Sequence, residues 1–258
     1  MSRKRFDLRM TDKVVAITGA SSGIGAALSE RLAAQGYRVA LIARRAGALE
    51  AVAARCGGRA LVIPADVTRR DDVRRAVATI IDRAGRLDVW VNNAGRGITR
   101  APSELTDDDI DEMMAVNVKS ALYGMQEVLP HFTARGDGHI VNISSMLGRI
   151  PYATIRSAYC GAKHFLNALT AAFRDELQGT HPGVQVSLVS PGVVYTDFGR
   201  NAAHGGPDSR ELPYGQSPEE VADVIASVIE SRAPDVYTRQ GFQQRVAEYF
   251  ATTGADPQ

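Results

Sequence analysis

The chain has 258 residues, a formal net charge of +1, 45% hydrophobic residues and 23% charged residues. This length suits one large α/β core, so we predict a single domain over residues 1–258. The small net charge, without a basic stripe interleaved with aromatic residues, argues against nucleic-acid binding. No apolar run is long enough to span a bilayer, so no membrane partner is expected.

Cysteine and histidine usage argues against a metal site. Cys56 and Cys160 have neither paired nor metal-like spacing, and the five histidines are scattered singly. Reduced thiols in a cytoplasmic protein are therefore expected. The basic start of the chain lacks the apolar stretch of a signal peptide. We predict loose tails at residues 1–10 and 251–258.

Short β-branched runs alternate with segments of helical periodicity along the whole chain. The predicted strands are residues 14–18, 38–43, 60–65, 89–92, 139–144 and 184–190, with a last short strand at 235–238. Apolar strands that alternate with helices predict an α/β, doubly wound parallel sheet with helices on both faces. Apolar residues in 240–250 predict a further helix, which could cover the chain's own core or a neighbouring subunit.

Four polar motifs each follow directly after a predicted strand: TGASSGIG, NNAG, ISS and SPG. In a doubly wound sheet, ligands bind in the crevice beyond the carboxyl ends of the strands. We therefore expect these motifs to converge on one edge of the sheet. A helix carrying Tyr159 and Lys163 begins shortly after the third motif.

The glycine loop after the first strand is the first candidate cofactor site. Glycines in such a loop permit a tight turn and let backbone N–H groups approach a pyrophosphate at a helix N-terminus. The spacing is G-x-x-x-G-x-G, and the loop could alternatively be an ordinary turn, but its place in an opening βαβ unit favours nucleotide binding. The expected contacts are Gly19, Ser21, Ser22, Gly23, Ile24 and Gly25.

The end of the second strand indicates which nucleotide is bound. An NAD site usually carries Asp or Glu there, whereas this chain carries Arg44 and Arg45. A guanidinium can pair bidentately with a 2′-phosphate, which predicts NADP(H). One or both arginines could alternatively only solvate the rim, Arg45 more readily than Arg44. Asp66 and Val67, after the third strand, are expected to reach the adenine edge.

Tyr159 and Lys163 lie four residues apart, on one face of the predicted helix. Such a pair can also occur by chance. Free tyrosine loses its proton near pH 10, which is too high for acid–base work at neutral pH. A nearby ammonium and a positively charged nicotinamide ring would lower the pKa of the phenol. Tyr159 is therefore the candidate general acid and base.

In order, TGASSGIG, ADVT, NNAG, AVNVKS, ISS, YCGAK and SPG make the chain resemble the short-chain dehydrogenase/reductase family in its single-domain form. The resemblance runs from about Lys13 to at least Ile229. It implies a Rossmann-type sheet of six to seven strands, a nicotinamide cofactor and hydride transfer without a metal. It also implies catalytic roles for Asn117, Ser145, Tyr159 and Lys163.

By this resemblance, Tyr159 exchanges a proton with the substrate oxygen, Ser145 holds that oxygen, and Lys163 also binds the nicotinamide ribose. Asn117 would anchor a water near Lys163, or could be a buried structural amide. The spacing from Ser145 to Tyr159 is slightly longer than usual in the family, so Ser144 is the alternative to Ser145. Tyr152, in the intervening loop, is expected to line the substrate pocket.

Two further segments resemble cofactor contacts of the family. Asn93, Ala94 and Gly95 would line the adenosine and ribose side, and the nicotinamide side would be lined by Pro191, Gly192, Val194 and Thr196. Residues 195–215 resemble a mobile substrate lid. Tyr195, Phe198 and Tyr214 would offer apolar walls. Arg200 and Arg210 could meet an anionic group or face water.

The sequence thus predicts an NADPH-dependent oxidoreductase that transfers hydride between nicotinamide and a ketone or secondary alcohol. The alternative is an NADP(H)-sensing regulatory protein on the same fold, although the full Asn–Ser–Tyr–Lys set argues for turnover. A homodimer or homotetramer is implied, because helices near 107–135 and 157–177 pair in relatives. Ala168, Ala171 and Ala172 would allow close helix approach.

Overall fold

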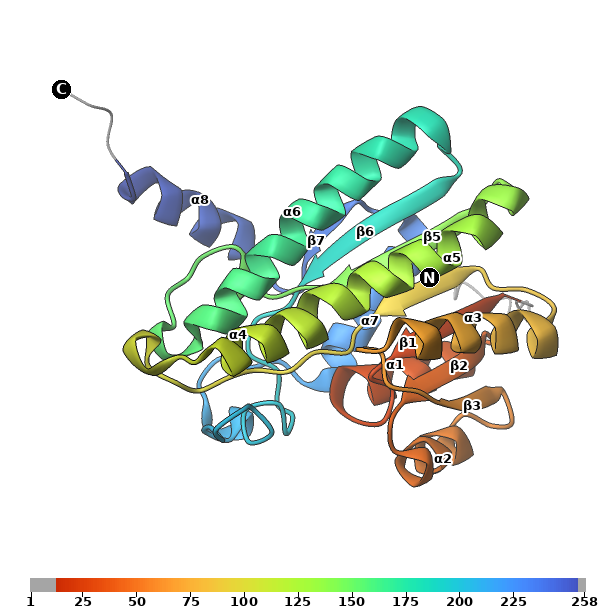
Figure 1. The fold of residues 1–258 in the computed structure, drawn as a ribbon, viewed down its shortest axis with the longest axis horizontal. Coiled ribbons are helices and arrows are strands. Elements are labelled where there is room, and N and C mark those ends of the chain that lie inside the picture. The colour runs from red at the N-terminus through yellow and green to blue at the C-terminus, as the bar shows by residue number, and fades with distance from the viewer. Residues whose placement is uncertain (1–12, 255–258) are drawn as a thin grey trace, which may run out of the picture.

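The computed structural model describes residues 13–254, which contain a seven-stranded parallel sheet in the order β3-β2-β1-β4-β5-β6-β7 (Figure 1). The strands are β1 Val14–Thr18, β2 Arg38–Ala43, β3 Ala60–Pro64, β4 Val89–Asn92, β5 Gly138–Ile143, β6 Val184–Ser190 and β7 Asp235–Tyr237. The order reverses between β1 and β4. This reversal opens a crevice at the carboxyl ends of these two strands.

Helices cover both faces of the sheet (Figure 1). They are α1 Gly23–Ala34, α2 Ala46–Arg55, α3 Arg70–Ala84, α4 Asp107–Met114, α5 Ser120–Arg135, α6 Ser157–Thr180, α7 Pro218–Ser231 and α8 Phe242–Thr252. Side chains alternate along each strand, so Val15 and Ile17 pack with α1, α2 and α7. Val14 and Ala16 pack with α3, α5 and α6 on the other face. The predicted doubly wound, Rossmann-type fold is confirmed.

Element boundaries differ from the sequence prediction by one or two residues. β3 ends at Pro64, β5 ends at Ile143 and β7 ends at Tyr237, each one residue earlier than expected. The predicted loose tail at 251–258 is wrong at its start, because α8 continues to Thr252. The rest of that tail from 255, and the predicted tail at 1–10, lie outside the described residues.

The segment from α4 to α5 forms a single helical run with an irregular turn. Thr106 caps α4 with a capping box to Asp109. Residues Ala115–Lys119 then form a π-helical turn, in which the Ser120 N–H bonds the Ala115 carbonyl. Such turns carry one extra residue and often lie at functional sites. Asn117 is in this turn.

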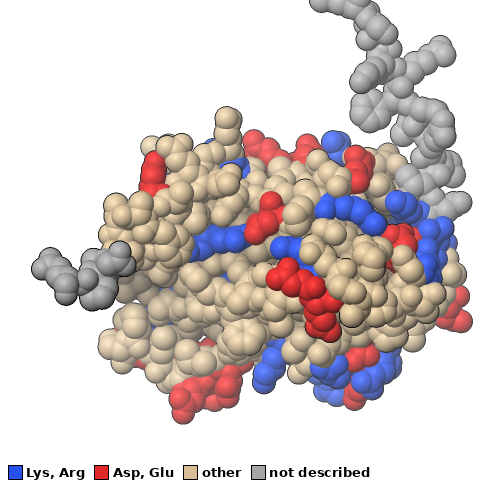
Figure 2. Space-filling view, turned by 90° about the horizontal axis from the view of Figure 1, so that it is seen from above, with Lys and Arg blue, Asp and Glu red and all other residues tan. Residues whose placement is uncertain are grey.

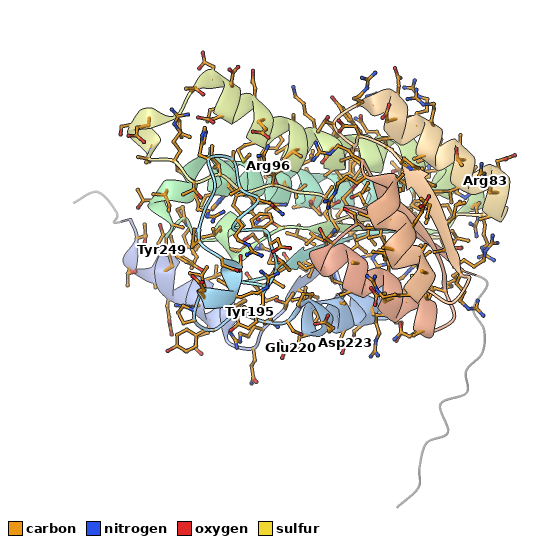
Figure 3. All side chains as sticks on the ribbon, turned by 90° about the horizontal axis from the view of Figure 1, so that it is seen from below. Arg83, Arg96, Tyr195, Glu220, Asp223 and Tyr249 are labelled. Atoms are coloured by element: carbon orange, nitrogen blue, oxygen red, sulfur yellow. The ribbon has the colours of Figure 1, made fainter. Side chains whose placement is uncertain are left out.

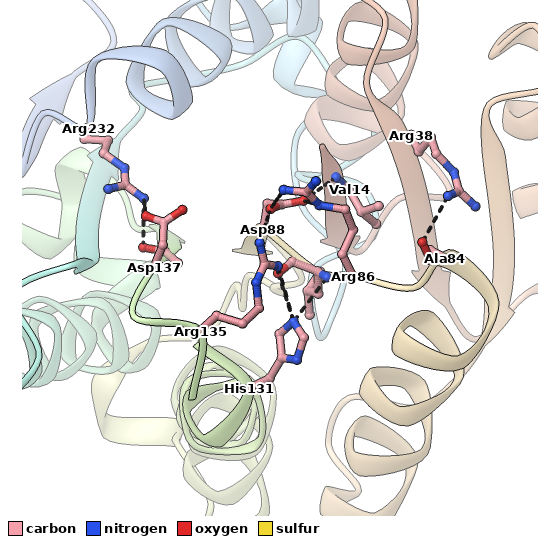
Figure 4. A network of polar contacts seen from close by, with 11 residues as sticks. Val14, Arg38, Ala84, Arg86, Asp88, His131, Arg135, Asp137 and Arg232 are labelled. Atoms are coloured by element: carbon pink, nitrogen blue, oxygen red, sulfur yellow. Dashed lines mark hydrogen bonds and ion pairs between the residues drawn. The ribbon is translucent and has the colours of Figure 1, made fainter. Parts of the chain in front are cut away.

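A charged network closes the amino-end edge of the sheet (Figure 4). The buried carboxylate of Asp88 accepts hydrogen bonds from the Val14 N–H at 2.8 Å, from Arg86 at 2.8 and 2.6 Å, and from Arg135 at 3.1 Å. These partners lower the pKa of Asp88, against the opposing effect of burial. The network ties β1, β4 and α5 together at this edge.

The remaining global features concern the cysteines, possible metal ligands, helix hydropathy and surface charge. In the described part of the chain, both cysteines are buried and free, and no cluster of possible metal ligands is present. No described helix is long and apolar enough to cross a membrane. Acidic and basic side chains are interspersed on the face shown in Figure 2.

Candidate functional site

The predicted motifs converge at the carboxyl-end edge of the sheet. A Cβ on Gly19 would lie 2.9 Å from the Ala94 Cα, and a Cβ on Gly23 would lie 3.1 Å from Thr196 Cγ2. Met146, which follows ISS, donates its N–H to the Pro191 carbonyl at 2.8 Å. Segments that are far apart in the sequence therefore surround one crevice, as expected.

The glycine loop has no space for side chains at its key positions. Gly19 has a φ of +67°, and Gly23 has a φ of +54°. A Cβ on Gly25 would lie 2.4 Å from the Gly19 carbonyl oxygen. The side chain of Ser22, the N-cap of α1, makes no capping hydrogen bond. This turn keeps the backbone close and presents the start of α1 to the crevice, which fits a bound pyrophosphate.

Asn93 holds the two central strands together. Its side-chain amide donates to the Thr18 carbonyl at 2.8 Å, and its N–H donates to Thr18 Oγ1 at 3.0 Å. The N–H of Ala94 also donates to Thr18 Oγ1. The side chain of Asn93 therefore shapes the floor of the crevice, and its predicted contact with adenosine remains a prediction.

The residues expected around the adenosine occupy the rim beyond β2 and β3. Arg44 and Arg45 are exposed, and neither side chain has a hydrogen bond or ion pair to another described residue. Asp66 is partly buried, and its carboxylate accepts from the Thr68 N–H at 3.0 Å and the Thr68 hydroxyl at 2.7 Å. Val67, beside it, packs against the core. The two arginines are free to meet a ligand, whereas Asp66 orders its own turn.

Tyr159 is buried in the first turns of α6, and its phenol neighbours the Ser145 hydroxyl. Burial raises its pKa to about 12, although Ser145 and then Arg156 act in the lowering direction. In the protein by itself, desolvation of the phenolate thus outweighs the effects of Ser145 and Arg156, and the lowering expected from Lys163 and a bound nicotinamide remains a prediction. Tyr159 is therefore a protonated donor at neutral pH.

Lys163 lies one helical turn further along, with its Nζ 5.8 Å from the centroid of the Tyr159 ring. The ammonium donates to the Ile143 carbonyl at 2.9 Å and is 3% exposed. Burial lowers the pKa of Lys163 to about 8. A Cβ on Gly95 would lie 3.6 Å from this Nζ and 3.0 Å from Asn117 Oδ1. Gly95 therefore keeps open the space between Lys163 and Asn117.

Asn117 is held by the loop after β4. Its Oδ1 accepts from the Arg96 N–H at 3.2 Å, and its Nδ2 donates to the Arg96 carbonyl at 2.9 Å and the Met113 carbonyl at 3.2 Å. This geometry makes Asn117 a support of the loop beside Lys163. The water expected next to it remains a prediction.

The two serines of the ISS motif have different surroundings. Ser144 donates to Asn167 Oδ1, and Asn167 donates to the Gly148 carbonyl at 2.6 Å. Ser145 instead neighbours the Tyr159 phenol and accepts from the Leu147 N–H at 3.1 Å. This arrangement favours Ser145 over Ser144 as the residue that holds a substrate oxygen. Tyr152, in the following loop, is 56% exposed.

The segment 191–196, which is expected on the nicotinamide side, is supported by two other parts of the chain. A Cβ on Gly192 would lie 2.7 Å from the ring of Phe242 in α8, so this helix packs directly on the segment. Val194 is buried and forms a bridge with Gln216. Thr196 accepts from the Phe198 N–H at 3.2 Å. The C-terminal stretch thus covers the chain's own core next to the site.

Residues 195–215 cross the mouth of the crevice and are tethered at several points. Tyr195 lines a groove with Asp223 of α7 (Figure 3), and its hydroxyl accepts from the Gly215 N–H at 2.9 Å. Further along, Ala203 bridges Ile98, and His204 contacts the Asp109 carboxylate at 2.6 Å. That contact, with others, lowers the pKa of Asp109.

The side chains expected to line this segment differ in their exposure. Phe198 packs edge-on against the Tyr159 ring, with centroids 5.6 Å apart, whereas Tyr214 is 84% exposed. Arg200 and Arg210 both form ion pairs with Asp197 and Asp208. These two arginines are therefore neutralised within the segment. The predicted mobility of the lid remains a prediction.

Sequence reasoning missed Arg156, which lies three residues before Tyr159 at the start of α6. A Cβ on Gly97 would lie 2.4 Å from its Nη1, and a Cβ on Gly206 would lie 3.2 Å from its Nη2. Burial lowers the pKa of Arg156, and the nearby Tyr159 acts in the opposite direction. The available signal was helical spacing, because residues i and i+3 share a helix face.

Comparison with known proteins identifies the family. The family model for short chain dehydrogenases matches residues 13–205. The chain belongs to the short-chain dehydrogenase/reductase family. It is 34% identical over 197 residues to an uncharacterised oxidoreductase of Staphylococcus epidermidis, and this match covers 74% of the chain and 84% of that protein. The chain is thus an oxidoreductase of this family.

Solved structures of the short-chain dehydrogenase/reductase family share the fold. An enzyme from Burkholderia phymatum in complex with NAD has a TM-score of 0.86 at 22% identity, covering 96% of this chain and 98% of that one. A short-chain dehydrogenase from Sphingobium yanoikuyae in complex with NADPH has a TM-score of 0.79 at 28% identity, covering 95% and 97%. Relatives of this fold therefore bind either nicotinamide dinucleotide.

Proposed function

We propose that this protein is an NADPH-dependent reductase of ketones, which also oxidises the corresponding secondary alcohols. The observation that carries the proposal is the buried Tyr159, which neighbours Ser145 and lies one helical turn from the buried Lys163. These three groups meet beside a glycine loop that suits a dinucleotide. A site with an acid, an oxygen-binding hydroxyl and a buried cation fits carbonyl reduction.

In the reductive direction, Ser145 donates a hydrogen bond to the substrate carbonyl oxygen and polarises it. The bound cofactor supplies the hydride. Tyr159 then gives its phenolic proton to the developing alkoxide, and its raised pKa keeps that proton available at neutral pH. Lys163 stabilises the phenolate left behind, and its ammonium would hold the nicotinamide ribose. In oxidation, the same proton returns to Tyr159.

The choice of NADPH rests on the rim of β2. The side chains of Arg44 and Arg45 are exposed and have no partner among the described residues, so a guanidinium is available for a 2′-phosphate. We expect Arg44→Ala to weaken NADPH binding far more than NADH binding. Arg45→Ala is the matched control, with a smaller effect if that residue only solvates the rim. Equal losses of both cofactors in Arg44→Ala, measured by titration calorimetry, would refute this cofactor assignment.

The test of the reaction is NADPH oxidation, followed by absorbance, across chemically distinct ketones with wild type and Tyr159→Phe. We expect the variant to bind NADPH normally and to lose about 100- to 10,000-fold in kcat/KM. Undiminished turnover by Tyr159→Phe would overturn the acid–base assignment. Tight NADPH binding without turnover of any ketone by wild type would favour the sensor alternative.

We also propose that α6 forms part of a subunit interface in a homodimer or homotetramer. Phe165 is 52% exposed, and Ala168, Ala171 and Ala172 on the same helix are exposed. An apolar side chain next to small residues permits close helix packing. Sedimentation equilibrium of wild type and Ala168→Glu tests this proposal. A monomer in both would contradict it.

A further inference from the structure

Arg156 has a position and surroundings that the catalytic residues do not account for. It is partly buried, and it forms no hydrogen bond or ion pair through its side chain with any described residue. A guanidinium removed from water normally needs a carboxylate or other acceptors, because desolvating a charge is costly. The other arginines at the mouth of the crevice have such partners: Arg96 pairs with Glu112, Arg100 with Asp109, and Arg200 with Asp197.

The space in front of Arg156 is kept free by two glycines. A Cβ on Gly97 would lie 2.4 Å from Nη1 and 3.0 Å from the Phe198 ring, so a side chain there would collide with both. A Cβ on Gly206 would lie 3.2 Å from Nη2. The guanidinium is thus enclosed by backbone on two sides and by an aromatic ring, but no negative charge is supplied to it.

A second polar group without a partner points to the same place. The hydroxyl of Thr99 is buried and has no hydrogen bond to any described residue. A Cβ on Gly206 would lie 2.8 Å from Thr99 Oγ1 and 3.2 Å from Arg156 Nη2, so both groups border the same space. Two donors without acceptors therefore converge on one small region beside the lid segment.

This region adjoins the reacting end of the site. Phe198 contacts the space next to Arg156 and also packs on the Tyr159 ring. Arg156 immediately precedes α6, three residues before Tyr159, and each of the two influences the charge of the other. A small molecule whose oxygen lies at Tyr159 can therefore extend past Phe198 toward the guanidinium.

We propose that Arg156, assisted by the Thr99 hydroxyl, binds an oxyanion carried by the substrate itself. The substrate class is then a ketone or secondary alcohol with a carboxylate or phosphate group a short distance from the reacting carbon. The planar guanidinium suits either oxyanion, because it offers two parallel N–H donors. This inference rests on the proposed reductase function and adds to it the charge of the substrate.

The experiment compares keto acids of increasing chain length with their methyl esters and with ketone phosphates of matched length. For wild type we expect kcat/KM for an anionic substrate to exceed that for its neutral partner by about 10- to 100-fold. Arg156→Gln should abolish this preference, because it lowers turnover of the anions far more than turnover of the esters. Arg156→Lys should retain part of it, and Thr99→Val should lose a smaller part.

Arg200→Gln is the matched control, because Arg200 lies in the same lid segment but already has carboxylate partners. It should keep the preference for anions. Whichever anion suffers the larger loss in Arg156→Gln identifies the group that is bound. Equal losses for anions and esters would overturn the proposal and assign Arg156 to positioning Tyr159, and no preference in wild type would overturn it outright.

A binding measurement separates this proposal from the proposed reaction. In Tyr159→Phe protein with NADPH, keto acids should bind more tightly than their esters by calorimetry. Adding Arg156→Gln should remove that difference. If wild type reduces no ketone but this preference is present, the reductase proposal fails and the anion site stands. If ketones are reduced without any charge preference, the reverse holds.

Discussion

The two ends of the sheet differ in how their charged side chains are paired. At the amino-end edge, the Asp88 carboxylate has a hydrogen bond from the Val14 backbone and ion pairs with Arg86 and Arg135 (Figure 4). At the carboxyl-end edge, the Arg156 side chain has no such partner among the described residues, and the Lys163 ammonium donates to an uncharged acceptor, the Ile143 carbonyl. The buried charge at the amino-end edge is therefore fully paired, whereas these two cations at the carboxyl-end edge lack a negatively charged partner in the described part of the chain.

This difference separates structural from functional polar groups. A buried charge whose hydrogen bonds are complete stabilises the fold and offers nothing to a ligand. A buried charge with free capacity costs stability, and that cost is recovered when a ligand of opposite charge binds. Residues at the two edges should therefore respond in opposite ways to substitution.

Lys163→Met should have the largest effect, because it should lower activity while it raises stability. We expect a loss of about 100- to 1,000-fold in kcat/KM, because the phenolate of Tyr159 loses its cation. We also expect unfolding to cost about 1 kcal/mol more, since a buried charge is replaced by an apolar side chain of similar length. Steady-state kinetics and urea denaturation test this pair of outcomes. Lower stability with unchanged kinetics would remove the distinction between the edges.

Asp88→Asn should have the converse effect. Two arginines would lose their shared carboxylate, so we expect stability to fall by about 2–4 kcal/mol. The kcat/KM of the folded variant should stay within twofold of wild type, because Asp88 lies at the far end of the sheet. Urea denaturation and kinetics at 15 °C measure both quantities. A large kinetic effect would show that the two edges are coupled.

Alkaline pH should lower activity through Lys163 at the carboxyl-end edge of the sheet, whereas acidic pH should lower stability through Asp88 at the amino-end edge. Because the pKa of Lys163 is lowered to about 8, its charge is lost above that pH, and reductive kcat/KM should fall tenfold per pH unit. The unfolded chain holds that proton up to about pH 10.5, so this group adds no alkaline instability. The pKa of Asp88 is lowered instead, and its stabilisation should disappear as pH falls below about 4. A pH–rate profile flat from 7 to 10 would contradict the assignment of Lys163.

The two serines of the ISS motif should give the smallest contrast. Ser145→Ala should lower kcat by about tenfold or more, because a hydrogen bond to the substrate oxygen is lost. Ser144→Ala should leave kcat unchanged and reduce stability by about 1 kcal/mol, through loss of the bond to Asn167. Kinetics and thermal denaturation of both variants decide between them. The reverse pattern would exchange their roles.

Much of this arrangement could be predicted from the sequence. The alternation of strands and helices defined the sheet, and the position of each motif after a strand placed Gly19, Asn93 and Ser145 at one edge. These inferences worked because strand periodicity and parallel topology are strong local signals. The ends of β3 and β7, both ends of β5 and the start of the C-terminal tail were wrong, by one or two residues.

Other features depended on contacts that a linear pattern does not contain. The raised pKa of Tyr159 depends on burial, which outweighs the opposing effects of Ser145 and Arg156. The pairing of Arg200 and Arg210 with Asp197 and Asp208 depends on how residues 195–215 fold back on themselves. The lack of a partner for the Arg156 guanidinium becomes visible only in the structure, where glycines from distant segments lie beside it.

The π-helical turn at Ala115–Lys119 differs from a regular α-helix by one extra residue. Deleting one residue there would let α4 and α5 join with ordinary i to i+4 bonding. It would also rotate everything beyond the deletion by about 100° about the helix axis, since an α-helix has 3.6 residues per turn. Asn117 would then leave the Arg96 backbone, and the loop beside Lys163 would lose its support. A regular helix at Ala115–Lys119 is therefore incompatible with the present shape of the crevice. A chain shortened by one residue there would gain regular helical hydrogen bonds and lose the support of the site.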